Sequence, residues 1–210
     1  MSELLFLDIE ACPTGNPESI EVKAPSNYKD EKKIAAYIES HRDEEFRKRA
    51  LKGITGQIVS IAWTIGNNEI DSLTTGIEAT TEEMLLYMFF DLLERHDQLP
   101  RFRWIGHNSI DFDLRYLKQR CWINNIKPAI MIPADAKHGD FSFDVMREFA
   151  GWKGFVSQDA LYEALGGPPI DNDIDGSMVY DLWKQGEYEK IAEYNRVDVE
   201  KLRYNYRRLT

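Results

Sequence analysis

The chain has 210 residues, of which 43% are hydrophobic and 12% aromatic, a composition typical of one globular domain and not of a disordered chain. Its formal net charge of −10 argues against a protein that binds nucleic acid through a broad basic face. Two distant cysteines predict neither a disulfide framework nor a zinc site, and no apolar run is long enough to span a bilayer. The first residues also lack the positive segment of a signal peptide, so we expect a cytoplasmic protein.

The first predicted element is a strand that ends in two acids. Asp8 and Glu10 follow the apolar run 4–7 and are separated by one residue. Because side chains alternate along a strand, both carboxylates should leave it on the same side. Two close acids on a buried face resist ionisation unless a cation lies between them, and their oxygen ligands suit hard ions such as Mg2+ or Mn2+. The alternative is a strand that reaches the surface at its end, where both acids would be solvated.

The rest of the pattern predicts an α/β fold. A helix over 30–51 interrupts what would otherwise be consecutive strands, so we interpret residues of about 20–55 as a helical insertion that could reach over a substrate. Further strands are predicted over 57–65, 69–75, 103–106 and 129–132, and further helices over 81–93, 113–117, 143–149, 157–165, 177–184 and 188–209. The expected architecture is a mixed sheet of about five strands covered by helices, in a single domain over residues 1–210.

Two later segments could complete a site with Asp8 and Glu10. Asp113 follows a strand and opens a helix, where a loop could present it toward the first strand; its ordinary alternative is a helix N-cap. Asn108, in the same loop, could hydrogen-bond a substrate or fix the loop. In the terminal helix Tyr194 and Asp198 are four residues apart and share one face, although a buried tyrosine with a nearby surface acid would give the same spacing.

Together these segments resemble a known family. Asp8-Ile9-Glu10, Asn108-x3-Phe112-Asp113 and Tyr194-x3-Asp198 are similar to the three motifs of DEDD exonucleases of the tyrosine subclass, which include the proofreading domain of B-family DNA polymerases. The chain also resembles stand-alone predicted 3'-5' exonucleases of bacteria and phages. The resemblance covers residues 4–205 and implies an RNase H-like fold, with a mixed five-stranded sheet flanked by helices. In the histidine subclass a histidine lies five residues before the last acid, and that position is Glu193 here.

The resemblance also implies a mechanism that uses two divalent metal ions, Mg2+ or Mn2+, to release nucleoside 5'-monophosphates from a 3' end. Asp8, Glu10 and Asp198 would hold one ion. Asp8 would bridge to the second ion, which Asp113 would support, and Tyr194 would orient the attacking water.

The expected partner is a nucleic acid 3' end, with single-stranded DNA favoured and RNA open. Ala11 and Cys12 would lie beside the terminal nucleotide, and Asn108 would contact the substrate or its loop. A polymerase or another replication or repair protein is a further candidate partner, and no membrane is expected. The alternatives are an RNA 3' exonuclease on the same scaffold and a catalytically silent module that binds a nucleic-acid end. The long segment between Cys12 and Gly56 departs from the compact connection of minimal members and leaves its role open.

Overall fold

A five-stranded mixed sheet forms the centre of the molecule. The computed structural model describes residues 3–96, 102–134, 141–171 and 173–210. The strands are β1 (Glu3–Pro13), β2 (Gly56–Ile65), β3 (Asp71–Thr74), β4 (Phe102–Gly106) and β5 (Ser142–Asp144), in the order β3-β2-β1-β4-β5. β1, β2 and β3 pair antiparallel, whereas β4 runs parallel to both β1 and β5. The predicted α/β architecture, with a mixed five-stranded sheet flanked by helices, is confirmed.

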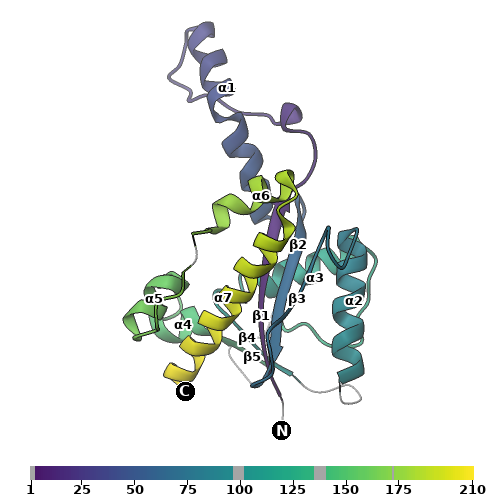
Figure 1. Cartoon of the computed structure of the whole chain (residues 1–210). Coiled ribbons are helices and arrows are strands. Elements are labelled where there is room, and N and C mark those ends of the chain that lie inside the picture. Colours follow the sequence, from purple (N-terminus) through teal and green to yellow (C-terminus); the bar gives the residue numbers. More distant parts are fainter. Residues whose placement is uncertain (1–2, 97–101, 135–140, 172) are drawn as a thin grey trace.

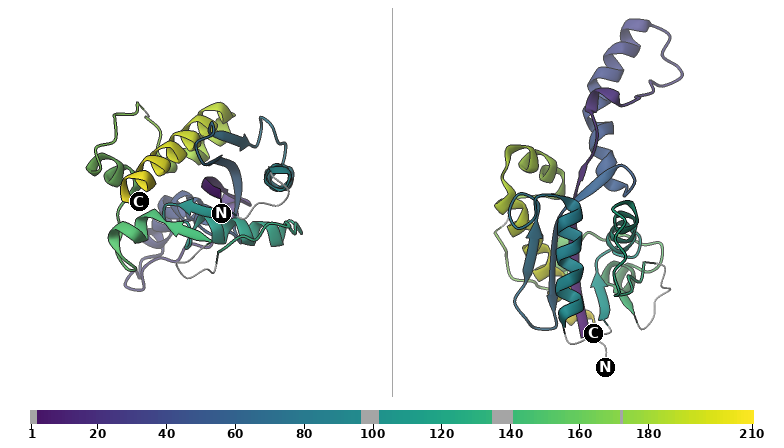
Figure 2. Two further views of the ribbon diagram at one scale, coloured as in Figure 1. Left: turned by 90° about the horizontal axis from the view of Figure 1, so that it is seen from below. Right: turned by 90° about the vertical axis from the view of Figure 1, so that its right-hand side faces the viewer.

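Helices cover both faces of this sheet (Figures 1 and 2). They are α1 (Glu31–Arg47), α2 (Glu82–Arg95), α3 (Asp113–Ile123), α4 (Val145–Ala150), α5 (Gln158–Ala164), α6 (Val179–Gln185) and α7 (Tyr188–Leu209), and short 3-10 helices lie at Pro17–Ser19, Lys48–Leu51 and Gly176–Met178. None of the helices in the described parts of the chain is long and apolar enough to cross a membrane.

The fifth strand does not lie where the sequence predicts it. Residues 129–132 are not a strand, although Ile130 and Ile132 are buried against the core. The strand is Ser142–Asp144, which pairs with β4. Three residues are too few to show an alternating pattern, so this strand is defined by its pairing and not by its own sequence. The helix expected over 143–149 accordingly begins at Val145, after Asp144, whose side chain caps it.

The alternation of β1 decides which helices face its acids. Leu5, Leu7 and Ile9 belong to the buried cluster that includes residues of α2 and α3. Phe6 instead packs with residues of α7, including Tyr206, at a ring distance of 5.3 Å. Asp8 and Glu10 continue the alternation of Phe6, so they point to the face that α7 covers.

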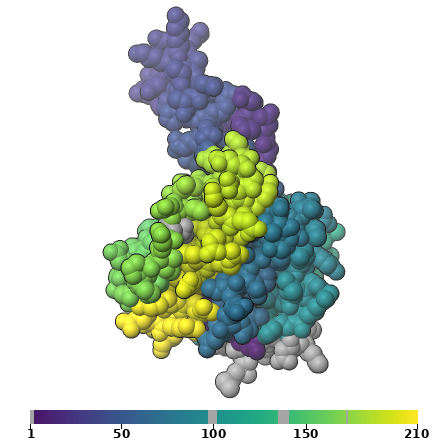
Figure 3. Space-filling view, viewed as in Figure 1, coloured from purple at the N-terminus to yellow at the C-terminus, as the bar shows by residue number. Residues whose placement is uncertain are grey.

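Residues 16–51, which overlap the insertion predicted over about 20–55, form a segment that we call the arm. It stands away from the body of the molecule (Figures 2 and 3). Of the side chains of α1, all of which are described, Phe46 alone is buried. The arm is therefore held to the body at the end of α1, close to the start of β2.

Candidate active site

Three acids from two elements converge at the face between β1 and α7. Asp8, Glu10 and Asp198 each offer one carboxylate oxygen, and these oxygens all lie within 4.8 Å of one another. The two β1 acids reach this face by strand alternation, and Asp198 reaches it because α7 packs across the same face. Residues 190 positions apart in the sequence thus form one cluster of oxygen ligands.

A buried asparagine on α7 orients Asp8. Asn195 is fully buried, and its Nδ2 donates to Asp8 Oδ2 at 2.7 Å. Its Oδ1 in turn accepts a hydrogen bond from the hydroxyl of Ser60, at 2.9 Å. Ser60 lies opposite Glu10 in the β1–β2 register. Asn195 therefore connects the strand acids to the sheet, a role that the sequence analysis missed. The available signal was its position in the buried stripe of α7, where Ile191 and Val199 flank it at helical spacing.

Asp113 lies beside the cluster but outside the group of three. It is the first residue of α3, so Phe112 and not Asp113 occupies the N-cap position. Its Oδ1 accepts a hydrogen bond from the backbone N–H of Ile9 at 3.2 Å. That N–H lies beyond the pairing of β1 with β4, which ends at Phe6 opposite Ile105. Asp113 thus satisfies a backbone group of the strand that carries Asp8 and Glu10.

The electrostatics of the cluster favour a bound cation. Burial raises the pKa of Asp8 well above its ordinary value, and repulsion from the neighbouring acids raises it further. Burial and the same repulsion raise the pKa of Glu10, and burial raises the pKa of Asp113 to about 7. Groups of this kind are costly to ionise unless positive charge lies between them. The donor set, composed of carboxylates, fits hard divalent ions such as Mg2+ or Mn2+.

Tyr194 is positioned by the cluster and stays protonated. Its hydroxyl donates to the carboxylate of Asp198, one helical turn further along α7. Burial and the nearby acids raise the pKa of Tyr194 far above its ordinary value. A tyrosine in this state can donate or orient a hydrogen bond, but it is a poor general base.

One cation lies next to Asp198. The Nζ of Lys201 is 3.4 Å from Asp198 Oδ1 and 2.6 Å from Asp159 Oδ1. Its side chain is buried, so the charge is little screened. Lys201 partly offsets the effect of burial on the pKa of Asp198. The sequence analysis did not identify this residue, although its spacing of three from Asp198 places the two on one helical face.

A second buried acid organises the loop that carries Asn108. Asp144 is fully buried and accepts hydrogen bonds from the backbone N–H groups of Asn108, at 3.0 Å, and Ile110, at 3.3 Å. Asn108 itself has a φ of 58°, in the left-handed region that asparagine tolerates. Arg147 completes the network, with Nη2 2.5 Å from Asp111 Oδ2. The loop that precedes Asp113 is thus held by β5, which sequence reasoning had placed elsewhere.

Removing the Asp144 carboxylate should destabilise the protein. Asp144→Ala leaves the backbone N–H groups of Asn108 and Ile110 without their acceptor, so we expect the free energy of unfolding to fall by about 3 kcal/mol. Denaturant titration measures this change. Glu148→Ala is the matched control, because Glu148 is exposed on α4. An effect of Asp144→Ala no larger than that of the control would contradict the role given to this network.

The two β1 residues after Glu10 differ in their surroundings. Ala11 lines a pocket beside Glu10. The side chain of Cys12 is fully buried in a cluster with Val59 and Val179. Any contact of Cys12 with a bound molecule would therefore involve its backbone.

Comparisons with known proteins agree with this geometry. A family model described as "Predicted 3'-5' exonuclease related to the exonuclease domain of PolB" matches residues 44–208. This range includes Asp113, Tyr194 and Asp198, whereas Asp8 and Glu10 precede it. No curated protein matches the chain significantly.

Among solved structures, the family B DNA polymerase from the hyperthermophilic archaeon Pyrobaculum calidifontis is similar, with a TM-score of 0.61 and 14% sequence identity. The match covers 96% of this chain and 24% of the polymerase chain, so the chain spans about a quarter of the length of that polymerase. This likeness supports the fold alone, and it confirms the predicted RNase H-like architecture.

Proposed function

The chain belongs to the family of predicted 3'-5' exonucleases related to the exonuclease domain of PolB, and from this we propose that it shortens nucleic acids from the 3' end by metal-dependent hydrolysis. The favoured substrate is single-stranded DNA. The observation that carries the proposal is the convergence of Asp8, Glu10 and Asp198, with one oxygen of each within 4.8 Å of the others. The third motif contains Tyr194, and Glu193 stands where the histidine subclass has its histidine, which supports the tyrosine subclass.

Two divalent ions, Mg2+ or Mn2+, held by Asp8, Glu10 and Asp198 with support from Asp113, would stabilise the charge on the attacking and leaving oxygens. The chain's own groups would prepare this site. Asn195 fixes the rotamer of Asp8 through its 2.7 Å hydrogen bond. Tyr194, with its proton retained, would orient the attacking water.

In the reaction, the oxygen of water joins the phosphorus and the bond from phosphorus to the 3' oxygen of the preceding nucleotide breaks. The products are a nucleoside 5'-monophosphate and a strand with a new 3' hydroxyl. Ala11 and the backbone of Cys12 would lie beside the departing nucleotide, and Asn108 would shape the loop on the other side. A polymerase or another replication or repair protein is a candidate partner, because the similar solved structure is a DNA polymerase.

Digestion of end-labelled oligonucleotides tests this proposal. Single-stranded DNA and RNA of one sequence, labelled at the 5' end, are incubated with the protein and Mg2+, Mn2+ or chelator. We expect a ladder that shortens from the 3' end and requires metal, with DNA digested faster. Faster digestion of RNA would make the protein an RNA exonuclease on the same scaffold. Intact strands that bind the protein even in chelator would replace the proposal with a silent end-binding module.

A further inference from the structure

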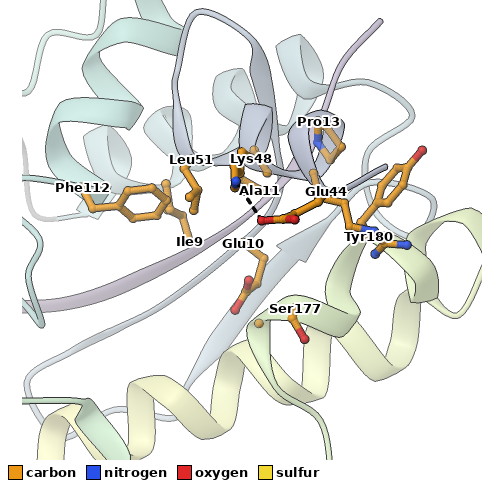
Figure 4. Close-up of a pocket in the computed structure, with 13 residues that line it drawn as sticks. Ile9, Glu10, Ala11, Pro13, Glu44, Lys48, Leu51, Phe112, Ser177 and Tyr180 are labelled. Atoms are coloured by element: carbon orange, nitrogen blue, oxygen red, sulfur yellow. Dashed lines mark ion pairs between the residues drawn. The ribbon is translucent and has the colours of Figure 1, made fainter. Parts of the chain in front are cut away.

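The arm begins beside the candidate active site and is fixed to the body there. Lys48 and Leu51 of the arm line a pocket that Glu10 also lines (Figure 4). Arg47 donates from both terminal nitrogens to Asp181 of α6, at 2.9 and 2.8 Å. A bidentate arginine pair of this kind holds both position and orientation. The arm therefore leaves the candidate active site in a defined direction.

A groove of about 920 Å3, which we call the arm groove, lies further out on the arm. Residues 27–30 line it, together with side chains of α1 that include Lys33, Tyr37 and His41. Lys33 lies 14 residues before Arg47, about 21 Å along the helix at 1.5 Å per residue. Figures 2 and 3 show this part of the arm beyond the body of the molecule. The arm groove is therefore a surface separate from the candidate active site.

Aromatic rings gather in the arm groove without forming a core. The rings of Tyr37 and His41 stack, with centroids 3.8 Å apart and planes at 19°. Tyr28 meets Tyr37 edge-on, at 5.6 Å, and is 39% exposed. Neither Tyr37 nor His41 is buried. Exposed rings of this kind can accept a nucleobase by stacking, whatever the base sequence.

The charge of the arm differs from that of the rest of the chain. Residues 16–51 contain eight Lys or Arg and eight Asp or Glu, so the whole net charge of −10 lies outside the arm. Four of the arm's cations form ion pairs with acids: Lys23, Arg42, Arg47 and Lys48. A polyanion is therefore repelled less by the arm than by the acidic body.

The lysines around the arm groove are free to bind phosphate. Lys29, Lys32 and Lys33 are exposed and form no ion pair with any residue of the described ranges. Asp30, which also lines the groove, accepts hydrogen bonds from the backbone N–H groups of Lys32 and Lys33, at 2.9 and 3.4 Å. The end of the helix is thus already capped, and side chains supply the positive charge. Cations beside exposed rings match the alternation of phosphate and base along a single strand.

We propose that the arm groove binds a single strand of nucleic acid upstream of the 3' end that lies at the three acids. Tyr37 and His41 stack on bases, while Lys29 and Lys33 neutralise phosphates. The proposal rests on the proposed exonuclease function and adds a second contact with its substrate. At about 3.4 Å per stacked nucleotide, a strand needs about six nucleotides to cover 21 Å, so only longer strands reach the groove.

The test compares a DNA trinucleotide with a single-stranded DNA of about 20 nucleotides. Tyr37→Leu keeps an apolar side chain and removes the ring, whereas Tyr37→Phe keeps the ring. In Tyr37→Leu we expect KM for the long strand to rise at least about fivefold, the lower limit for stacking on one base. KM for the trinucleotide and kcat for both strands should stay unchanged, and Tyr37→Phe should behave as the wild type.

Salt dependence tests the lysines. Binding of the long strand is measured by fluorescence anisotropy in the Asp8→Asn background, where hydrolysis should be blocked. Replacing Lys29 and Lys33 together with alanine should make the plot of log affinity against log salt shallower by about 1.4, at about 0.7 for each phosphate contact. Lys23→Ala is the matched control, because Lys23 lies on the arm outside the groove and pairs with Glu21. It should leave the slope unchanged.

Three results would overturn the proposal. One is an equal loss for the trinucleotide and the long strand in Tyr37→Leu, another is no loss for the long strand. The third is a change in the particle mass measured by light scattering with strand binding unaltered, which would make the groove an interface between copies of the chain. Digestion that ignores the groove variants would remove the arm groove and leave the exonuclease standing. Strand binding that depends on the groove, without any digestion, would do the reverse.

Discussion

Replacing Asp8 with asparagine should make the metal-free protein more stable and abolish its activity. Asparagine keeps an oxygen that can accept the hydrogen bond from Asn195, so the packing of the site is preserved. It removes one negative charge from a carboxylate whose pKa is raised by burial and raised further by repulsion from the neighbouring acids. We expect the melting temperature to rise, by about 2–4 °C for each kcal/mol in a chain of this size. Turnover should fall on the order of a thousand-fold or more, as when a preorganised electrostatic group is lost.

Thermal unfolding in chelator and in Mg2+ measures the first part of this prediction. The gain in stability should be largest in mildly alkaline buffer. In acidic buffer the folded wild-type carboxyl group is itself protonated, because its pKa is raised, and so the two proteins become alike. Mg2+ should stabilise the wild type by about 2.7 kcal/mol at a hundred times its Kd, and the variant less. A variant that is less stable than the wild type in chelator would show that the acids do not repel one another as described.

The fold could be predicted from sequence where elements carry their own pattern. The terminal helix was expected over 188–209 and is observed at Tyr188–Leu209, because its amphipathic stripe repeats over six turns. β1 was found from its apolar run. β5 could not be found, since Ser142–Asp144 is defined by its pairing with β4, whose partner residues lie 38 positions earlier in the chain. A short strand of this kind is a property of the sheet and not of its own segment.

The residues of the candidate site also fall into two groups, those that could be recognised from the pattern of their own segment and those that could not. Asp8 and Glu10 were identified from their spacing within β1, and Tyr194 and Asp198 from their spacing within α7. The structure brings the three acids and the hydroxyl of Tyr194 together. Their roles in catalysis stay predictions. The groups that orient them were missed, because the position of Asn195 in the buried stripe of α7 predicts burial but no partner, and Asp144 has no distinctive spacing. Asn195 and Asp144 acquire a function only when α7 and β5 bring them against the strand and loop that carry the acids.

Replacing Asn195 with leucine should lower both stability and activity, in contrast to Asp8→Asn. Leucine has a similar size but supplies neither the donor for Asp8 nor the acceptor for Ser60. The carboxylate of Asp8 then lacks its donor, at about 1–3 kcal/mol for a buried group, while the hydroxyl of Ser60 keeps its hydrogen bond with Thr74 at 2.9 Å. Asp8 also loses the contact that fixes its rotamer, and loss of such supporting contacts typically costs about 10–100-fold in metal affinity or activity. Denaturant titration and the rate of nucleotide release at several Mg2+ concentrations measure the two effects.

Asn205→Leu separates the catalytic part of this effect from the structural part. Asn205 is also fully buried on α7, where its Nδ2 donates to the backbone oxygen of Gln158 at 3.3 Å and not to one of the three acids. We expect this control to lose stability and to keep the metal dependence of the wild type. If Asn195→Leu raised the Mg2+ requirement no more than Asn205→Leu does, then Asn195 would be a structural residue of the helix. A larger requirement in Asn195→Leu alone would mean that the orientation of Asp8, and not merely its charge, determines how the site binds metal.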